Sequence, residues 1–552
     1  MLRSDAKVVP VEGAPAPATQ PAKDEGKEVI LDVLHFNDVY NLEPQFADEP
    51  VGGATRFMTV MDELKKSIVA EGGKPLVAFS GDFVGPSLMS TLSQGAHLID
   101  AFNVLGVDFA TFGNHELDYG YESLVNRLGG VDSDVQDDDI PFEDYPETKA
   151  QWIMTNMTET ASGLPLGGKW AKKSALVDWT GAKGECVKVG IIGVSEDWLK
   201  GCSQLKPNEI TYEDFIESAR TNAKELKAQG ADIVLALTHC RLKNDRILTD
   251  AVPEIDLLLG GHDHFYRRER GARIVKGGEE WRWLNHLQIV IDPVAKSVLR
   301  VYTERHDVYE DIPEHPEMVR VVQKYNNMAE LKYSRVLCTT SVEMDPTEAF
   351  VRFKESAIAN WCCDIFASDH SEAEGVQEAD AVIIGGFVFA GKQAIPAGPF
   401  TLGNLFSVFP RPGTLVVLKL SGADIIRDLE LGAKFLPQEC GSLRHVSKRL
   451  KYTIVIPQDR VKYPTVKDVM FDDQPIDLTR MYSVGMPGSQ AKGKYGFVWL
   501  KDAERIVDEE SASQLQDIFR MHCRRHYGGG GGKEKIVAEA PSMGRITLEF
   551  EK

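Results

Sequence analysis

Residues 54–82 read ATRFMTVMDELKKSIVAEGGKPLVAFSGD, and this stretch decides the fold. Apolar residues recur at helical spacing from Phe57 to Ile68, and two glycines at positions 72 and 73 end the pattern. The following run from Pro75 to Ser80 is short and apolar, which is typical of a buried strand. A similar run from Val29 to Phe36 precedes the helix. The pattern therefore predicts a strand-helix-strand unit.

Further runs of the same kind follow at Val107 to Phe112, Lys188 to Val194, Asp232 to Thr238 and Ile255 to Gly260. Their repetition predicts an α/β layer architecture for residues 29–310, in which helices cover the faces of the sheets. In such a domain polar residues gather where the strands end.

The rest of the chain divides by composition. Residues 1–28 are expected to be a disordered leader, and the charged segment 311–339 is rich in helix formers and predicts a linker helix. Residues 340–527 are predicted to form a second, mixed domain. Residues 528–552 begin with five glycines, which is typical of a flexible spacer before a short tail.

Within the second domain three elements stand out. We expect a helix at Thr347 to Ser368, an apolar strand at Ala381 to Ile384 and a hairpin-like run at Thr414 to Leu420. Strands and helices of this kind in one segment predict an α+β arrangement.

Composition excludes several classes of protein. With 62 Lys and Arg against 83 Asp and Glu among 552 residues, the formal charge is −21, which argues against binding a nucleic-acid polymer. The apolar stretches are shorter than the roughly 20 residues of a membrane-spanning helix, so no membrane contact is expected. Eight scattered cysteines form no disulfide framework, and the leader has no apolar signal core. A cytoplasmic location is predicted.

Short polar segments directly follow several predicted strands. They are Asn37 to Tyr40, Ser80 to Asp82, Gly113 to Glu116, Thr238-His239 and Gly260 to His264. Each one alone is typical of a cap or a turn. Because the carboxyl ends of strands in an α/β domain meet at one crevice, together they predict a metal site.

The residue types indicate which metals and which chemistry. Carboxylate, amide oxygen and imidazole suit Mn, Zn, Fe or Co better than Ca, and a pair of such ions favours phosphoryl transfer. A carboxylate would have to bridge the pair. Asp82 is the candidate for that bridge, since Gly81 leaves the backbone free to bend.

On these residues the chain resembles the calcineurin-like metallophosphoesterases, and within them the 5'-nucleotidase family. Residues 113–120 read GNHELDYG, close to that family's Gly-Asn-His-Glu-Phe-Asp-x-Gly, and a Gly-Gly-His-x-His element stands at 260–264. The resemblance implies an α/β, four-layer metallophosphoesterase domain, a β-sheet sandwich flanked by helices. It also implies a C-terminal α+β 5'-nucleotidase-type domain that binds the substrate.

The resemblance also implies roles for individual residues. Two divalent metal ions would be bound, one by Asp82, Asn114, His239 and His262 and the other by Asp38, Asp82 and His264. His115 would be the catalytic histidine, oriented by Asp118.

Two departures from the family pattern affect these expectations. Where the family reads Asp-x-His, the chain has Tyr40, which could give a phenolate oxygen to a hard trivalent ion or merely pack beside a weakened site, the one that contains Asp38 and His264. In the C-terminal domain Gly385 and Gly386 are followed by Phe389 in place of an arginine. Phe497 is a candidate to stack on a base, with a core aromatic as the alternative.

The resemblance implies a metal-dependent phosphoester hydrolase. A metal-bound hydroxide would release phosphate from a small-molecule phosphoester, with nucleoside 5'-monophosphates as the default substrate. A 2',3'-cyclic-nucleotide phosphodiesterase and a UDP-sugar hydrolase are the alternatives within the enzyme class. The alternative of another class is a catalytically impaired protein that binds nucleotides or phosphate.

Overall fold

The computed structural model describes residues 28–130, 145–181, 184–199, 202, 204–369, 378–411, 413–438, 441–458, 462–493, 497–509, 512–527, 537–538 and 540–551. The predicted leader, apart from Glu28, and the glycine run at 528–532 lie outside these residues. No helix in the described ranges combines the length and apolar composition that crossing a membrane requires. The cytoplasmic location stays a prediction.

The first of two compact units contains most of the chain up to Asn326 and is built on two sheets. In spatial order, the seven-stranded sheet contains β15 (Ser297–Asp307), β14 (Trp283–Asp292), β1 (Val29–Phe36), β2 (Pro75–Ser80), β3 (Phe109–Thr111), β4 (Gln151–Ile153) and β6 (Ala171–Lys172). The six-stranded sheet contains β12 (Tyr266–Glu269), β13 (Ile274–Gly277), β11 (Leu257–Gly260), β10 (Ile233–His239), β8 (Cys186–Ser195) and β7 (Ser174–Thr180).

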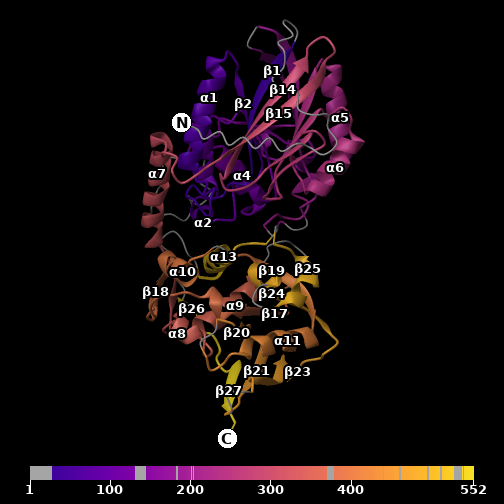
Figure 1. Ribbon diagram of the computed structural model, residues 1–552. Helices are drawn as coiled ribbons and strands as arrows, with labels where there is room; N and C mark the ends of the chain where they lie inside the picture. Colours follow the sequence, from indigo (N-terminus) through magenta and orange to yellow (C-terminus); the bar gives the residue numbers. More distant parts are fainter. Residues whose placement is uncertain are drawn as a thin grey trace. The chain divides into compact units, whose positions relative to one another are not determined.

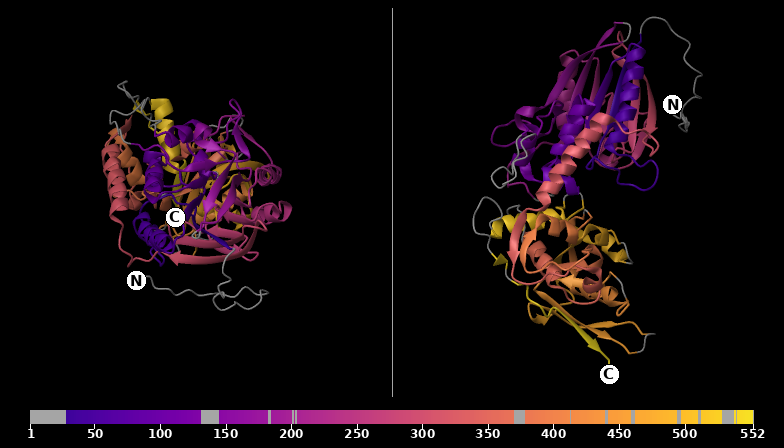
Figure 2. Two further views of the ribbon diagram at one scale, coloured as in Figure 1. Left: turned by 90° about the horizontal axis from the view of Figure 1, so that it is seen from above. Right: turned by 90° about the vertical axis from the view of Figure 1, so that its left-hand side faces the viewer.

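The two sheets pack against each other, and helices cover their outer faces. Alternate residues of the strands, such as Leu31 of β1 and Leu235 of β10, fill the core between the sheets. Outside the first sheet Phe36 contacts Phe57 of α1 (Ala54–Ala70), with ring centroids 5.1 Å apart. Outside the second lie α5 (Phe215–Ala228) and α6 (Leu242–Ala251). The strands run between these helices, which confirms the predicted four layers (Figure 1, with further views in Figure 2).

The second unit begins within α7 (Pro316–Tyr333) and has an α+β architecture, as predicted. Its five-stranded sheet contains β20 (Arg444–Val446), β17 (Ala381–Gly385), β24 (Met481–Pro487), β19 (Leu415–Ser421) and β25 (Glu504–Val507). The four-stranded sheet contains β23 (Gln474–Pro475), β22 (Thr465–Phe471), β21 (Leu450–Ile456) and β27 (Ile546–Phe550), and the three-stranded sheet β18 (Gly398–Thr401), β16 (Val336–Thr340) and β26 (Val537–Ala538). Its longer helices are α9 (Ala357–Asp369), α11 (Gly422–Ala433) and α13 (Leu515–Tyr527).

The structure corrects two expectations for this unit and adds a strand that was not expected. The helix expected at 347–368 is two helices, α8 (Glu348–Val351) and α9, because Ser356 Oγ donates to the Asp345 carbonyl and favours a turn between them. The run at 414–420 is no hairpin, since β19 pairs with β24 and β25 from far along the chain. The tail contains a strand, because the alternating apolar residues of 546–550 pair with β21.

Candidate metal centre

The predicted ligands lie on loops at the carboxyl ends of strands of both sheets. Strands β1, β2 and β3 run parallel, as do β10 and β11, so their loops gather at a common edge. Four of these residues have left-handed backbones, with φ of 51° at Asp38, 68° at Asp82, 80° at His262 and 57° at His264. Such backbones are costly for residues other than glycine and cluster at functional sites.

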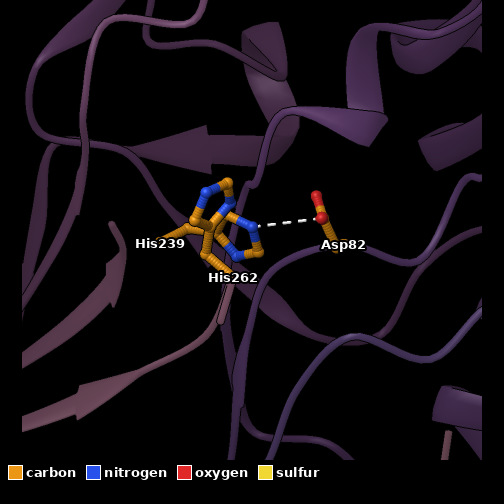
Figure 3. Close-up of side chains that lie close together, drawn as sticks. All are labelled: Asp82, His239 and His262. Atoms are coloured by element: carbon orange, nitrogen blue, oxygen red, sulfur yellow. Dashed lines mark ion pairs between the residues drawn. The ribbon is translucent and has the colours of Figure 1, made fainter. Parts of the chain in front are cut away.

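The first donor group consists of Asp82, His239 and His262, whose ligand atoms all lie within 4.8 Å of one another (Figure 3). His262 Nδ1 lies 3.1 Å from the Asn114 side-chain oxygen, so the fourth predicted ligand joins the group. All three side chains of the first group are buried.

The ring of His239 shows that a cation belongs in this group. Its Nδ1 donates to the Ser80 carbonyl at 2.7 Å, so Nε2 is the ring nitrogen that faces the donor group. Nε2 is buried, has no hydrogen-bond partner in the described chain, and faces Asp82 Oδ2 at 3.1 Å. Burial lowers the pKa of His239, but the Asp82 and Asp38 carboxylates outweigh it and raise the pKa to about 9. The position between Nε2 and Asp82 therefore favours positive charge, which a proton on the ring supplies in the metal-free protein and a metal ion could supply in its place.

The second donor group surrounds the hydroxyl of Tyr40. This oxygen lies 3.2 Å from Asp38 Oδ1, 3.2 Å from Asp82 Oδ2 and 3.0 Å from His264 Nε2. Asp38 Oδ1 and His264 Nε2 are themselves 3.1 Å apart. One hydroxyl proton cannot serve both carboxylate oxygens, so this group also fits a cation.

Asp82 belongs to both groups and also contacts the predicted catalytic dyad. Its Oδ1 accepts the backbone N–H of His115 at 3.0 Å. The His115 Nδ1 lies 2.9 Å from Asp118 Oδ2, the contact expected if Asp118 orients the ring. The structure thus brings together all eight residues predicted for metal binding and catalysis: Asp38, Asp82, Asn114, His115, Asp118, His239, His262 and His264.

Comparison with known proteins accounts for both parts of the chain. The family described as calcineurin-like phosphoesterase matches residues 31–266, and the family described as 5'-nucleotidase, C-terminal domain, matches residues 336–502. The chain belongs to the 5'-nucleotidase family of calcineurin-like metallophosphoesterases. It is therefore a hydrolase, and its family implies divalent metal ions, for which the structure has candidate binding groups.

Individual relatives support this placement. The trifunctional nucleotide phosphoesterase protein YfkN of Bacillus subtilis is 26% identical over 505 residues, which are 87% of this chain and 33% of that protein. The 5'-nucleotidase of Mus musculus is 22% identical over 569 residues, covering 94% of this chain and 92% of its own length. The solved structure of Haemophilus influenzae NAD nucleotidase has a TM-score of 0.71 at 17% identity, covering 96% and 100% of the two chains. The structural likeness supports the two-domain fold.

Glu116 supports the metal centre of this phosphoesterase, a role that the sequence did not reveal. Its buried carboxylate accepts the backbone N–H groups of Asp82 at 3.1 Å, Phe83 at 2.6 Å and Gly113. A Cβ at Gly113 would overlap the Asp82 carboxylate and the His239 ring. The close approach of these loops therefore requires Gly113, which has no Cβ, and Glu116, which binds the loop backbones.

Lys276 is a second supporting residue missed from the sequence. Its side chain is 1% exposed, and its ammonium group forms ion pairs with Asp245 at 2.5 Å and Asp263 at 2.9 Å. It also donates to the carbonyls of Cys240 and Gly261, each at 2.6 Å. One buried cation thus ties the loop after His239 to the loop that carries His262 and His264.

We expect Lys276→Met to lower the free energy of unfolding by about 3–5 kcal/mol, because it leaves buried Asp245 without its partner. The matched control is Lys296→Met. Lys296 pairs with Asp232 at 2.9 Å but is 58% exposed, so about 0–1 kcal/mol is expected. Urea unfolding of the metal-free proteins measures both. Equal losses of unfolding free energy in the two variants would contradict a stabilising role for the buried ion pairs of Lys276.

The predicted substrate-binding residues Gly385, Gly386 and Phe497 lie in the second unit. Phe497 is 1% exposed, and the Arg444 guanidinium sits 4.0 Å above its ring. Arg444 also pairs with Asp428 at 2.9 Å and fills the space in which a Cβ at Gly385 would lie. The ring of Phe497 is thus packed in a core, and base stacking by it stays a prediction.

Proposed function

We propose that this protein releases phosphate from nucleoside 5'-monophosphates. The observation that carries the proposal is the sharing of Asp82 between two cation-demanding donor groups, with the His115–Asp118 pair beside them. The names of the mouse and Bacillus relatives, a 5'-nucleotidase and a nucleotide phosphoesterase, support a nucleotide as the substrate. In this proposal residues 29–310 carry out hydrolysis and the domain from residue 340 binds the nucleotide.

Each residue has a definite task in the proposed reaction. Asp82, Asn114, His239 and His262 would hold one divalent ion, and Asp38, Asp82 and His264 the other. Bound ions would supply positive charge that polarises the phosphoryl group. The same charge would lower the pKa of water, so that hydroxide is available to attack phosphorus. Glu279, 3.2 Å from His264 Nδ1, fixes the ring so that Nε2 faces Asp38.

His115 would act on the phosphoryl group and the leaving oxygen. Because its Nδ1 bonds to Asp118, the nitrogen that can stabilise charge or deliver a proton to the leaving nucleoside is Nε2. The backbone N–H of His115 is already bound to Asp82, which couples the ring's position to the shared ligand.

Phosphate release from a panel of substrates tests this proposal. The panel contains nucleoside monophosphates, 2',3'-cyclic nucleotides, UDP-sugars and an aryl phosphate, each with added Mn and with a chelator. We expect metal-dependent release that is fastest with nucleoside 5'-monophosphates. A faster rate with cyclic nucleotides or UDP-sugars would identify that class of compound as the substrate instead. No release from folded, metal-loaded protein would favour the binding-protein alternative.

We further propose that Tyr40 binds the ion of the second group, because its oxygen lies about 3 Å from three other donors. Tyr40→Phe is then expected to raise the metal concentration for half-maximal activity about 10–100-fold, and Tyr40→His should restore binding by supplying an imidazole. Metal content after dialysis is the second readout. Tyr325→Phe, which removes a buried hydroxyl bound to the Ala96 carbonyl, is the control. An unchanged metal requirement in Tyr40→Phe would mean that Tyr40 only packs.

A further inference from the structure

A second polar cluster lies on the hairpin of β14 and β15, outside the candidate metal centre. His286 stands opposite Glu304 in the register of the two strands, and His306 stands opposite Leu284. Since Leu287 and the next odd-numbered apolar residues of β14 fill the core between the sheets, these three polar residues share the face that points away from that core. One ligand atom from each of the three lies within 4.8 Å of the others.

One ring nitrogen of His306 has no hydrogen-bond partner among the described residues. Its side chain is 12% exposed, and Nε2 is buried without a hydrogen-bond partner among the described residues. The Glu304 carboxylate oxygen lies 3.8 Å from this nitrogen, too far for a hydrogen bond. This nitrogen is therefore the ring atom that a ligand would contact.

His286 is held in the manner of a metal-binding histidine. Its Nε2 lies 2.9 Å from Asp32 Oδ1, and Gln288 donates to the same oxygen at 3.1 Å. A carboxylate on one ring nitrogen fixes the tautomer and leaves the other, Nδ1, with the lone pair. Glu304 completes the set with a carboxylate whose side chain is 52% exposed, so the cluster can be reached from solvent.

We propose that His286, Glu304 and His306 bind one divalent transition-metal ion of the zinc type. Two imidazoles and one carboxylate are a donor set that zinc accepts. Bond lengths of about 2.0–2.2 Å place tetrahedral ligand atoms roughly 3.3–3.6 Å apart, so the 3.8 Å separation of His306 and Glu304 needs little adjustment. Since β15 is the edge strand and pairs only with β14 in its sheet, the ion fastens that edge.

Metal stoichiometry tests this site on the full chain. The wild type and His306→Gln are dialysed against zinc, and the bound metal is counted by elemental analysis. We expect the variant to bind one equivalent less than the wild type, while the Mn-dependent hydrolase rate stays within about twofold, since no donor of the candidate metal centre changes. Zinc should also raise the melting temperature of the wild type more than that of the variant.

Two further variants keep the test decisive. Glu304→Gln changes a half-exposed side chain and should lose the same equivalent even if His306→Gln folds poorly. His315→Gln is the matched control, because His315 pairs with Asp62 outside the cluster and should keep the full zinc count. Cobalt in place of zinc gives a visible spectrum whose intensity should fall in both cluster variants. Zinc counts equal to the wild type in both would overturn the proposal.

Discussion

Replacing His115 by alanine is expected to lower kcat about 10²–10⁴-fold while bound metal and the free energy of unfolding stay near the wild-type values. The side chain supplies a positioned nitrogen to the reaction, whereas its contact with the shared ligand Asp82 runs through the backbone N–H, which alanine keeps. Steady-state kinetics at saturating Mn, together with metal analysis of the same preparation, measure both parts of this expectation.

The pairing of His115 with Asp118 sharpens the experiment. Asp118→Asn should lower kcat in the same direction by a smaller factor, because it disturbs only the tautomer and orientation of the ring. The double variant should be no slower than His115→Ala, since residues acting as one unit are not additive. His315→Ala is the control for loss of a histidine elsewhere. Wild-type kcat in His115→Ala would remove the dyad from the proposed mechanism.

Local sequence patterns predicted the strands and the residues that follow them. The runs at Val29 to Phe36 and Pro75 to Ser80 coincide with β1 and β2, and the apolar spacing of residues 54–70 coincides with α1. These elements could be predicted because a single regular spacing of apolar side chains defines each of them. Polar residues after parallel strands meet at one edge, so a metal site could be predicted there. The division of its ligands into two groups came from the family resemblance.

Contacts between distant segments were not predictable in the same way. Lys276 looks like an ordinary charge on a short strand, and its partner Asp245 lies 31 positions earlier in the chain. Only the completed sheet places them side by side. The hydroxyl of Tyr40 is a similar case, because the spacing Asp-x-Tyr names the residue but not the three donors around its oxygen. The signal for β27, an alternation of apolar residues at 546–550, was present but short.

Asp82→Asn should have the widest effect of any single substitution, because it removes the one carboxylate common to both donor groups. An amide is neutral and offers one oxygen instead of two, so neither group keeps its charge balance. We expect metal binding to weaken by more than the 10–100-fold typical of losing a supporting residue. Activity should fall to the level of the chelator-treated wild type.

Thermal stability measured with and without metal distinguishes loss of metal binding from loss of the fold. In the metal-free protein burial raises the pKa of Asp82, but the neighbouring His239 outweighs it and lowers that pKa, so Asp82→Asn should also lower the melting temperature measured with chelator. The rise in stability that metal adds is therefore the quantity that reports metal binding. With metal at about 100 times its dissociation constant the wild type gains roughly 2.7 kcal/mol, and the variant should lose that gain. Asp428→Asn, a buried carboxylate of the second unit, should lower stability with and without metal but keep the difference between them. A full metal-induced shift in Asp82→Asn would show that the ions do not depend on the shared carboxylate, and the mechanism would then need another bridge.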